Sequence, residues 1–257
     1  MRLLLLVWLG VGAWAASAET PRWSVTSGPA VVPLLELYTS EGCSSCPPAE
    51  TWLSRLVDAP GLWRTIVPVA FHVTYWDDLG WPDRYGSGFA TERQYRYADA
   101  WHSRTVYTPM FVRQGREWQI GAKPAPEAPG GQLALTYDGT FLAATYTPAQ
   151  PVAPPLELHL ALLGCDLTVA VASGENAGRR LRHDFVVLAH RADALPQHGP
   201  SYTLTTRLPA TGKPLPARAA LAVWVARPDA PAPLQAAGGW LTADQVSGGA
   251  TKKVGEK

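Results

Sequence analysis

Apolar positions in the first half of the chain follow two kinds of pattern. Residues 31–38 and 66–73 are nearly continuous apolar runs rich in β-branched residues, which is typical of buried strands. Between them, after prolines that suit a first helical turn, apolar residues recur at the spacing of one helix face, at Trp52, Leu53, Leu56 and Val57. This order predicts two parallel strands joined by a helix over 48–57, with the loop 39–42 at the carboxyl end of the first strand.

The second half of the chain changes to short apolar or alternating runs separated by Gly, Pro, Asn and Asp. These runs are residues 133–137, 141–146, 156–163, 167–172, 185–190, 202–208 and 220–226. Their length and spacing predict an antiparallel sandwich. We therefore predict an α/β domain over 19–121, a Pro- and Gly-rich linker over 122–131, a β-rich domain over 132–246 and a disordered tail over 247–257.

The N-terminal residues have the three parts of a secretory signal. Arg2 is followed by an almost uncharged run over 3–15 and then by three small residues that end at Ala18. Because the run is shorter than the roughly 20 apolar residues of a membrane span, we predict a cleaved signal peptide over 1–18, with an uncleaved anchor as the alternative. The mature protein is then exported to the periplasm or the extracellular space, without membrane association, where disulfides persist.

Composition narrows the classes of partner. The chain has 22 basic and 21 acidic residues, and removal of the predicted signal takes away Arg2 and no acid, so the net charge becomes zero. A neutral chain without a basic stripe is not expected to bind nucleic acid. Three cysteines exclude a disulfide-rich scaffold, and we interpret the odd one, Cys165, as a small buried hydrophobe, with covalent dimerisation as the alternative. We expect a monomer without a cofactor.

Two cysteines three residues apart flank Ser44 and Ser45 at the junction of the first predicted strand and helix. At the start of a helix, Cys43 lies where unpaired backbone N–H groups favour a thiolate, and Cys46 can resolve a mixed disulfide. This placement indicates a redox disulfide. Two alternatives stay open: a structural disulfide, and copper or zinc held by the two thiolates with His72, for which no fourth ligand is evident.

Longer motifs surround the cysteines. They are Leu35-Glu36-Leu37-Tyr38-Thr39-Ser40-Glu41-Gly42-Cys43-Ser44-Ser45-Cys46-Pro47-Pro48-Ala49-Glu50, Phe71-His72-Val73, Tyr75-Trp76-Asp77, Leu79-Gly80-Trp81, Val106-Tyr107-Thr108-Pro109 and Gly174-Glu175-Asn176-Ala177-Gly178-Arg179 with Leu181 and His183. With them the chain resembles the thioredoxin superfamily and, more narrowly, is similar to a family of secreted thioredoxin-like bacterial proteins of unknown function, DUF1223. The resemblance implies an α/β thioredoxin-like domain followed by an all-β antiparallel sandwich-like domain.

The resemblance also implies roles for individual residues. Cys43 would be the attacking thiolate and Cys46 the resolving cysteine. Thr108 and Pro109 would form the loop opposite the dithiol, where a cis proline leaves backbone groups free to pair with an extended substrate. Trp76 belongs to an aromatic segment that roofs the active site or fills the core, and we place it with Thr108 and Pro109 as substrate-binding.

Glu36 is an acid within the first apolar strand. By the same resemblance it lies buried beneath the dithiol, where a carboxylate of raised pKa would take the proton of Cys46. The alternative is an acid that pairs with an arginine or faces solvent at a strand edge.

Two other polar segments are interpreted without a ligand. A set of four residues lacks the spacing of a calcium loop, so we interpret it as part of a solvated turn: His72, Asp77, Asp78 and Asp83. Residues 174–178 form a turn by composition, and the charged run at 179–184 predicts a hairpin whose charges are solvated or paired with one another. Contact between this charged run and the first domain is the alternative.

These observations predict an exported thiol–disulfide oxidoreductase. Cys43 and Cys46 would exchange electrons with protein or peptide thiols and disulfides, or with a small thiol, and Glu36 would accept a proton. The alternatives are a copper-binding chaperone that uses the same cysteines and a non-catalytic interaction protein. Whether the protein acts as oxidant, reductant or isomerase stays open, because Ser44 and Ser45 supply hydroxyls but no imidazole.

Overall fold

The computed structural model describes residues 21–123, 126–212, 214–242 and 245. The predicted signal peptide over 1–18 and the predicted tail over 247–257 lie outside these residues. The described part contains fifteen strands, two α-helices and two 3₁₀ helices. None of its helices is long and apolar enough to cross a membrane.

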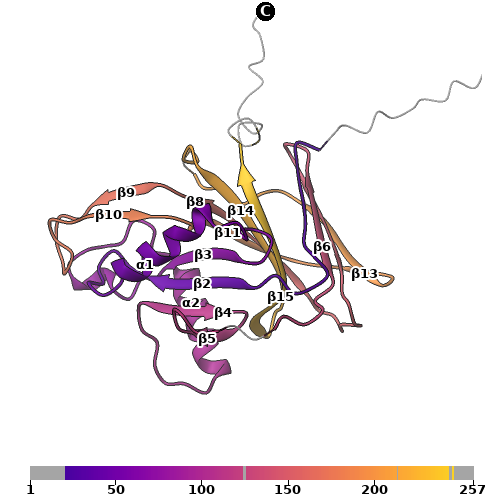
Figure 1. Ribbon diagram of the computed structural model, residues 1–257, viewed down its shortest axis with the longest axis horizontal. Helices are drawn as coiled ribbons and strands as arrows, with labels where there is room; N and C mark the ends of the chain where they lie inside the picture. Colours follow the sequence, from indigo (N-terminus) through magenta and orange to yellow (C-terminus); the bar gives the residue numbers. More distant parts are fainter. Residues whose placement is uncertain (1–20, 124–125, 213, 243–244, 246–257) are drawn as a thin grey trace, which may run out of the picture.

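The larger sheet has eight strands in the order β15-β14-β8-β11-β3-β2-β4-β5 (Figure 1). In chain order they are β2 (Leu34–Thr39), β3 (Val67–His72), β4 (Met110–Arg113), β5 (Arg116–Trp118), β8 (Glu157–Gly164), β11 (Val186–Ala194), β14 (Ala219–Arg227) and β15 (Ala230–Leu241). Strands β2 and β3 pair in parallel, as expected for strands joined by a helical crossover. Strand β11 then joins the other edge of β3, with Val186 opposite Ala70, and so continues the sheet into the C-terminal half of the chain.

The smaller sheet has five antiparallel strands in the order β1-β6-β7-β13-β12. They are β1 (Trp23–Thr26), β6 (Gln132–Tyr137), β7 (Leu142–Thr147), β12 (Gln197–His198) and β13 (Ser201–Thr206). This sheet packs against β8, β14 and β15, as Figure 1 shows for β6 and β13 beside β14 and β15. Since successive side chains point to opposite faces of a strand, Val223 of β14 lies in the core between the sheets and Trp224 in the core on the other face.

Two helices cover opposite faces of β2. They are α1 (Pro47–Ser54), which continues into the 3₁₀ helix η1 (Arg55–Asp58), and α2 (Gly88–Ala100), which follows the 3₁₀ helix η2 (Asp77–Leu79). Thr39 bonds to Glu50 of α1, whereas Glu36 bonds to Arg93 of α2. The hairpin of β9 (Leu167–Ala170) and β10 (Arg180–His183) lies beside α1 (Figure 1). These elements surround the carboxyl end of β2.

The predicted fold class is wrong. The protein is mostly β, with sheets of eight and five strands and only two α-helices in its described part, rather than an α/β thioredoxin-like domain followed by a sandwich-like domain. Hydrophobic patterns identify strands, but the partner of each strand depends on contacts far apart in the sequence. Here one edge of β3 is not paired with β2, and β11 forms hydrogen bonds along that edge. Strands from both halves of the chain therefore form one sheet.

Candidate dithiol site

The two cysteines of the Cys-Ser-Ser-Cys motif form a disulfide at the start of α1. Their Cα atoms lie 5.5 Å apart, within the usual range for a disulfide. Cys46 is the N-cap of α1, and its carbonyl accepts hydrogen bonds from the backbone N–H groups of Ala49 and Glu50. Pro47 and Pro48 occupy the first helical positions, where a missing N–H costs no intrahelical bond.

The prolines also change the electrostatics expected for Cys43. They remove two of the N–H groups that a helix start otherwise presents to an anion. The donor that the structure places beside Cys43 is the hydroxyl of Ser45, with its Oγ 3.3 Å from Sγ. A Cys43 thiolate would therefore depend on a side-chain hydroxyl more than on the helix.

A loop between β9 and β10, residues 173–178, holds the disulfide loop in place. The Asn176 amide donates to the carbonyl oxygens of Glu41 and Cys43, both at 2.9 Å, and Glu175 accepts from the N–H of Ser44 at 3.0 Å. The hydrogen bonds that Glu175 accepts from Ser44 lower the pKa of its carboxyl group. Cys43 and Cys46 are both fully buried, whereas Ser44 is exposed. The 173–178 loop is thus part of the site. Within the charged run at 179–184, His183 contacts Glu50 of the first half of the chain, as in the alternative interpretation, whereas Arg182 pairs with Asp166 and Asp184.

Trp76 and the Thr108–Pro109 segment meet on another side of the disulfide loop. The indole N–H of Trp76 donates to Thr108 Oγ1 at 2.8 Å, and the Thr108–Pro109 peptide bond is cis. A Cβ placed on Gly42 would lie 3.3 Å from the Cβ of Trp76, so Trp76 packs directly on the turn before Cys43. The structure therefore places Trp76 against the dithiol loop and joins Thr108 to it through the Trp76 indole.

Glu36 lies on the opposite face of β2, beneath α2. Its carboxylate accepts from Arg93 Nε at 2.7 Å and Nη2 at 3.0 Å, and from the hydroxyls of Tyr38 at 2.8 Å and Tyr97 at 2.5 Å. Burial and the Glu36 charge raise the pKa of both tyrosines. Among the described residues Glu36 has no hydrogen bond to either cysteine. Of the two interpretations given above, the structure shows the one in which Glu36 pairs with an arginine.

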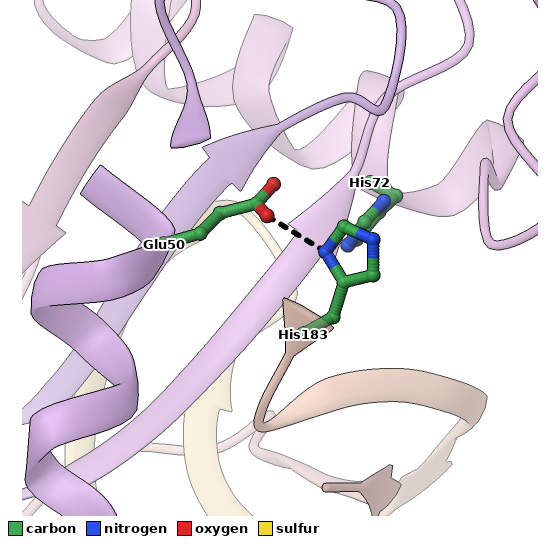
Figure 2. Close-up of side chains that lie close together, drawn as sticks. All are labelled: Glu50, His72 and His183. Atoms are coloured by element: carbon green, nitrogen blue, oxygen red, sulfur yellow. Dashed lines mark hydrogen bonds and ion pairs between the residues drawn. The ribbon is translucent and has the colours of Figure 1, made fainter. Parts of the chain in front are cut away.

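A second polar cluster, which the sequence reasoning missed as a unit, lies behind the dithiol loop. It consists of Glu41, Glu50, His72, Asp83 and His183, all buried. His72 Nδ1 lies 2.7 Å from Asp83 Oδ2, and His183 Nδ1 lies 2.7 Å from Glu50 Oε2 (Figure 2). We call these five residues the His–carboxylate cluster. The prediction that His72 and Asp83 belong to a solvated turn is therefore wrong, because both are buried and the His72 ring packs against the ring of Tyr85.

Protonation in the cluster follows its pairs. Burial opposes the charged forms of Asp83 and His72, but their mutual attraction outweighs it. The pKa of Asp83 is lowered to about 2 and the pKa of His72 is raised. Burial, with the nearby charge of Asp83, raises the pKa of Glu41.

The remaining cysteine lies apart from this site. Cys165 is buried and free, and its sulfur accepts a hydrogen bond from the N–H of Phe185. Burial raises the pKa of its thiol to about 12. These facts agree with the interpretation of Cys165 as a small buried hydrophobe, and they make it a matched control for the reactive pair.

Comparisons with known proteins place the chain in a family. Protein AGR_C_4864 from Agrobacterium tumefaciens has a similar structure, with 23% identity and a TM-score of 0.57 over 83% of this chain and 95% of that one. HBP35 of Porphyromonas gingivalis is similar with 13% identity and a TM-score of 0.57, over 90% of this chain and 81% of its own. At these identities the likeness concerns the fold alone, and no curated protein matches. The model of a family described as protein of unknown function matches residues 34–226, so the chain belongs to the DUF1223 family.

Proposed function

We propose that the protein is an exported thiol–disulfide oxidoreductase that acts through Cys43 and Cys46. The observation that carries the proposal is the disulfide between these residues at the N-terminus of α1, directly after β2. A bridge that closes so short a loop restricts the unfolded chain little, so stabilisation alone is a weak reason for it. The Cys-Ser-Ser-Cys motif and the cis Thr108–Pro109 bond resemble features of the thioredoxin superfamily, and this proposal concerns the site rather than the fold class.

One round of exchange needs no reactant besides a thiol substrate, and a disulfide such as oxidised glutathione returns the protein to its oxidised form for the next round. A substrate thiolate attacks Cys43 Sγ, a new S–S bond forms, and the Cys43–Cys46 bond breaks with its electron pair on Cys46 Sγ, which takes a proton. A second substrate thiolate then attacks the substrate sulfur of the mixed disulfide and releases Cys43 as a thiolate. The substrate dithiol is oxidised to a disulfide and the protein is reduced to its dithiol. The reverse sequence reduces a substrate disulfide.

Access to the disulfide is part of the proposal. Both sulfur-bearing residues are covered, and the hydrogen bonds of Asn176 and Glu175 hold the covering loop to the disulfide loop. Exchange therefore requires the 173–178 loop to move away. Trp76 packs on the turn before Cys43 and bonds to Thr108, which supports the assignment of both to a docking surface for an extended peptide.

Export and partners follow from the sequence pattern. The predicted signal peptide over 1–18 supports transfer to a compartment where disulfides persist. The partners we propose are protein or peptide thiols and disulfides in that compartment.

A turnover assay tests the proposal. The oxidised protein is mixed with an excess of a reduced dithiol peptide and with oxidised glutathione, which regenerates the protein disulfide, and the oxidised peptide is measured by mass spectrometry. We expect multiple turnovers, none with Cys43→Ser, and a mixed disulfide on Cys43 that accumulates with Cys46→Ser. The matched control Cys165→Ser should turn over at the wild-type rate. Exchange at the wild-type rate by Cys43→Ser, or no exchange by the wild type, would refute the proposal.

A further inference from the structure

Three side chains of the His–carboxylate cluster converge from elements far apart in the chain. Glu50 comes from α1, His72 from the end of β3 and His183 from the end of β10 (Figure 2). One nitrogen or oxygen of each lies within 4.8 Å of one such atom of both others, and all three residues are buried. Two imidazoles and one carboxylate are a frequent ligand set for divalent transition-metal ions.

Three buried polar atoms of the cluster have no hydrogen-bond partner among the described residues. They are His72 Nε2, His183 Nε2 and Glu41 Oε1. Buried polar side-chain atoms are normally paired, so three unpaired atoms in one cluster indicate a missing component. The missing component must accept the lone pair of His72 and change the bonding of His183.

The surroundings of each histidine fit a metal ligand. His72 Nδ1 bonds to Asp83 Oδ2 at 2.7 Å, which fixes the ring and leaves Nε2 to donate its lone pair. Histidine ligands usually have such a carboxylate on their other nitrogen. On the far side of the His183 ring, Nε2 lies 3.7 Å from Glu41 Oε1, too far for a hydrogen bond but aligned to become one.

We propose that His72 Nε2, His183 Nδ1 and the Glu50 carboxylate bind a divalent first-row transition-metal ion such as Zn²⁺. The ion takes the place of the hydrogen bond between His183 Nδ1 and Glu50 Oε2, whose atoms move apart from 2.7 Å to about 3.3 Å, the edge of a tetrahedron with bonds of about 2.0 Å. The His183 proton then lies on Nε2 and is donated to Glu41 Oε1. This single change gives all three unpaired atoms a partner.

Charge supports the same site. Three carboxylates, those of Glu41, Glu50 and Asp83, are buried together, and the two histidines are the partners of their charges. A divalent cation supplies the positive charge that two neutral imidazole ligands do not carry. The second oxygen of Glu50 accepts from Thr39 Oγ1 at 2.5 Å, so the carboxylate is held in place from β2.

Tyr85 borders both the His–carboxylate cluster and a cavity. The Tyr85 ring lies 5.5 Å from the His72 ring and 5.9 Å from the His183 ring, between centroids. The same residue lines a cavity of about 660 Å³ whose other walls include Phe89 and Leu188. Movement of this one side chain would connect the cluster with the cavity.

Metal content tests the proposal without reference to exchange activity. The full-length protein is incubated with ZnSO₄, freed of excess ion by gel filtration and assayed by mass spectrometry for zinc per chain. We expect one tightly held zinc in the wild type and in the double variant Cys43→Ser/Cys46→Ser, which removes the thiolates as ligands. His183→Gln and His72→Gln should lose it, whereas His198→Gln, a matched change at an exposed histidine, should retain it.

A second measurement covers variants that fold poorly. Glu50→Gln keeps the shape of the side chain, and Asp83→Asn should weaken zinc binding about 10- to 100-fold through the orientation of His72. Circular dichroism without zinc reports folding, and added zinc should raise the Tm of the wild type but not of folded Glu50→Gln. The proposal is overturned if the wild type retains no zinc, if both histidine variants retain it, or if the double serine variant loses it. The last result would place the metal on the dithiol, and the failure of the metal site would leave the exchange proposal unaffected.

Discussion

Replacement of Glu36 by glutamine separates a structural role of this acid from a catalytic one. Glu36 and Arg93 have side chains that are 0% and 1% exposed, and the carboxylate receives two bonds from Arg93 and one each from Tyr38 and Tyr97. Glutamine keeps the shape but removes the charge, so the guanidinium stays buried without a counter-charge. We expect Glu36→Gln to destabilise the protein strongly and to leave disulfide exchange intact.

The magnitude follows from the burial of the pair. Removing one partner of a buried ion pair costs about 3–5 kcal/mol, because the other charge is left uncompensated. For a domain of this size, 1 kcal/mol shifts the Tm by about 2–4 °C, so the Tm should fall by roughly 6–20 °C. Since the cost arises from the leftover charge, Arg93→Met added to Glu36→Gln should cost less than the sum of the single changes.

Urea unfolding followed by circular dichroism measures this free energy, and peptide oxidation at a temperature where the variant is folded measures exchange. Glu92→Gln, a change at an exposed residue on the same helix as Arg93, serves as the control. Its free energy of unfolding should stay within about 0.5 kcal/mol of the wild type. A loss of less than about 1 kcal/mol in Glu36→Gln would refute the ion-pair account. A folded variant whose exchange rate falls by about tenfold or more would return Glu36 to the role of proton acceptor.

Three further changes test the site and its surroundings. Asn176→Ala removes two hydrogen bonds of about 0.5–1.5 kcal/mol each from the covering loop, so dithiothreitol should reduce the disulfide roughly 5- to 150-fold faster, as seen by thiol labelling. Ser45→Ala removes the hydroxyl beside Cys43, so the pKa of the reduced Cys43 thiol should rise by about 1–2 units in an ultraviolet titration of the thiolate. Burial, with the nearby Arg93 charge, lowers the pKa of His190 to about 3. Below about pH 6.5 the unfolded chain therefore binds a proton at His190 that the folded protein does not bind. Between pH 7.5 and pH 5 the free energy of unfolding should therefore fall by about 1–2 kcal/mol more in the wild type than in His190→Phe.

Each of these changes has a matched control. Gln197→Ala is an exposed amide replacement away from the loop and should leave the reduction rate unchanged. Ser44→Ala removes the neighbouring hydroxyl, and an equal rise in the Cys43 pKa in that variant would contradict a specific bond from Ser45. His198→Phe changes an exposed histidine and should keep the wild-type pH dependence. Parallel pH curves for the wild type and His190→Phe would show that His190 is protonated in the folded protein.

Local features of the structure could be predicted from the sequence, whereas its long-range pairing could not. The apolar runs at 31–38 and 66–73 correspond to the parallel pair β2 and β3, and the helical pattern at 48–57 corresponds to α1 and η1. The addition of β11 to β3 depends on a contact between Ala70 and Val186, which no local pattern contains. The predicted fold class was wrong for this reason.

The same distinction applies to the site. The disulfide was predictable because both cysteines lie in one short motif. His183 was interpreted as part of a charged hairpin, although on β10 it lies two residues after buried Leu181, in alternation with exposed arginines, and so faces inward. That alternation could have indicated a buried histidine, but its proximity to Glu50 comes only from the packing of β10 against α1.

The reduction potential of the Cys43–Cys46 disulfide tests the central claim most directly. The protein is equilibrated in glutathione or dithiothreitol buffers of defined potential, trapped with a thiol-alkylating reagent and analysed by mass spectrometry. A catalytic pair should titrate above about −300 mV, in the range of exchange proteins. A potential well below about −300 mV is that of a structural disulfide and would contradict the account.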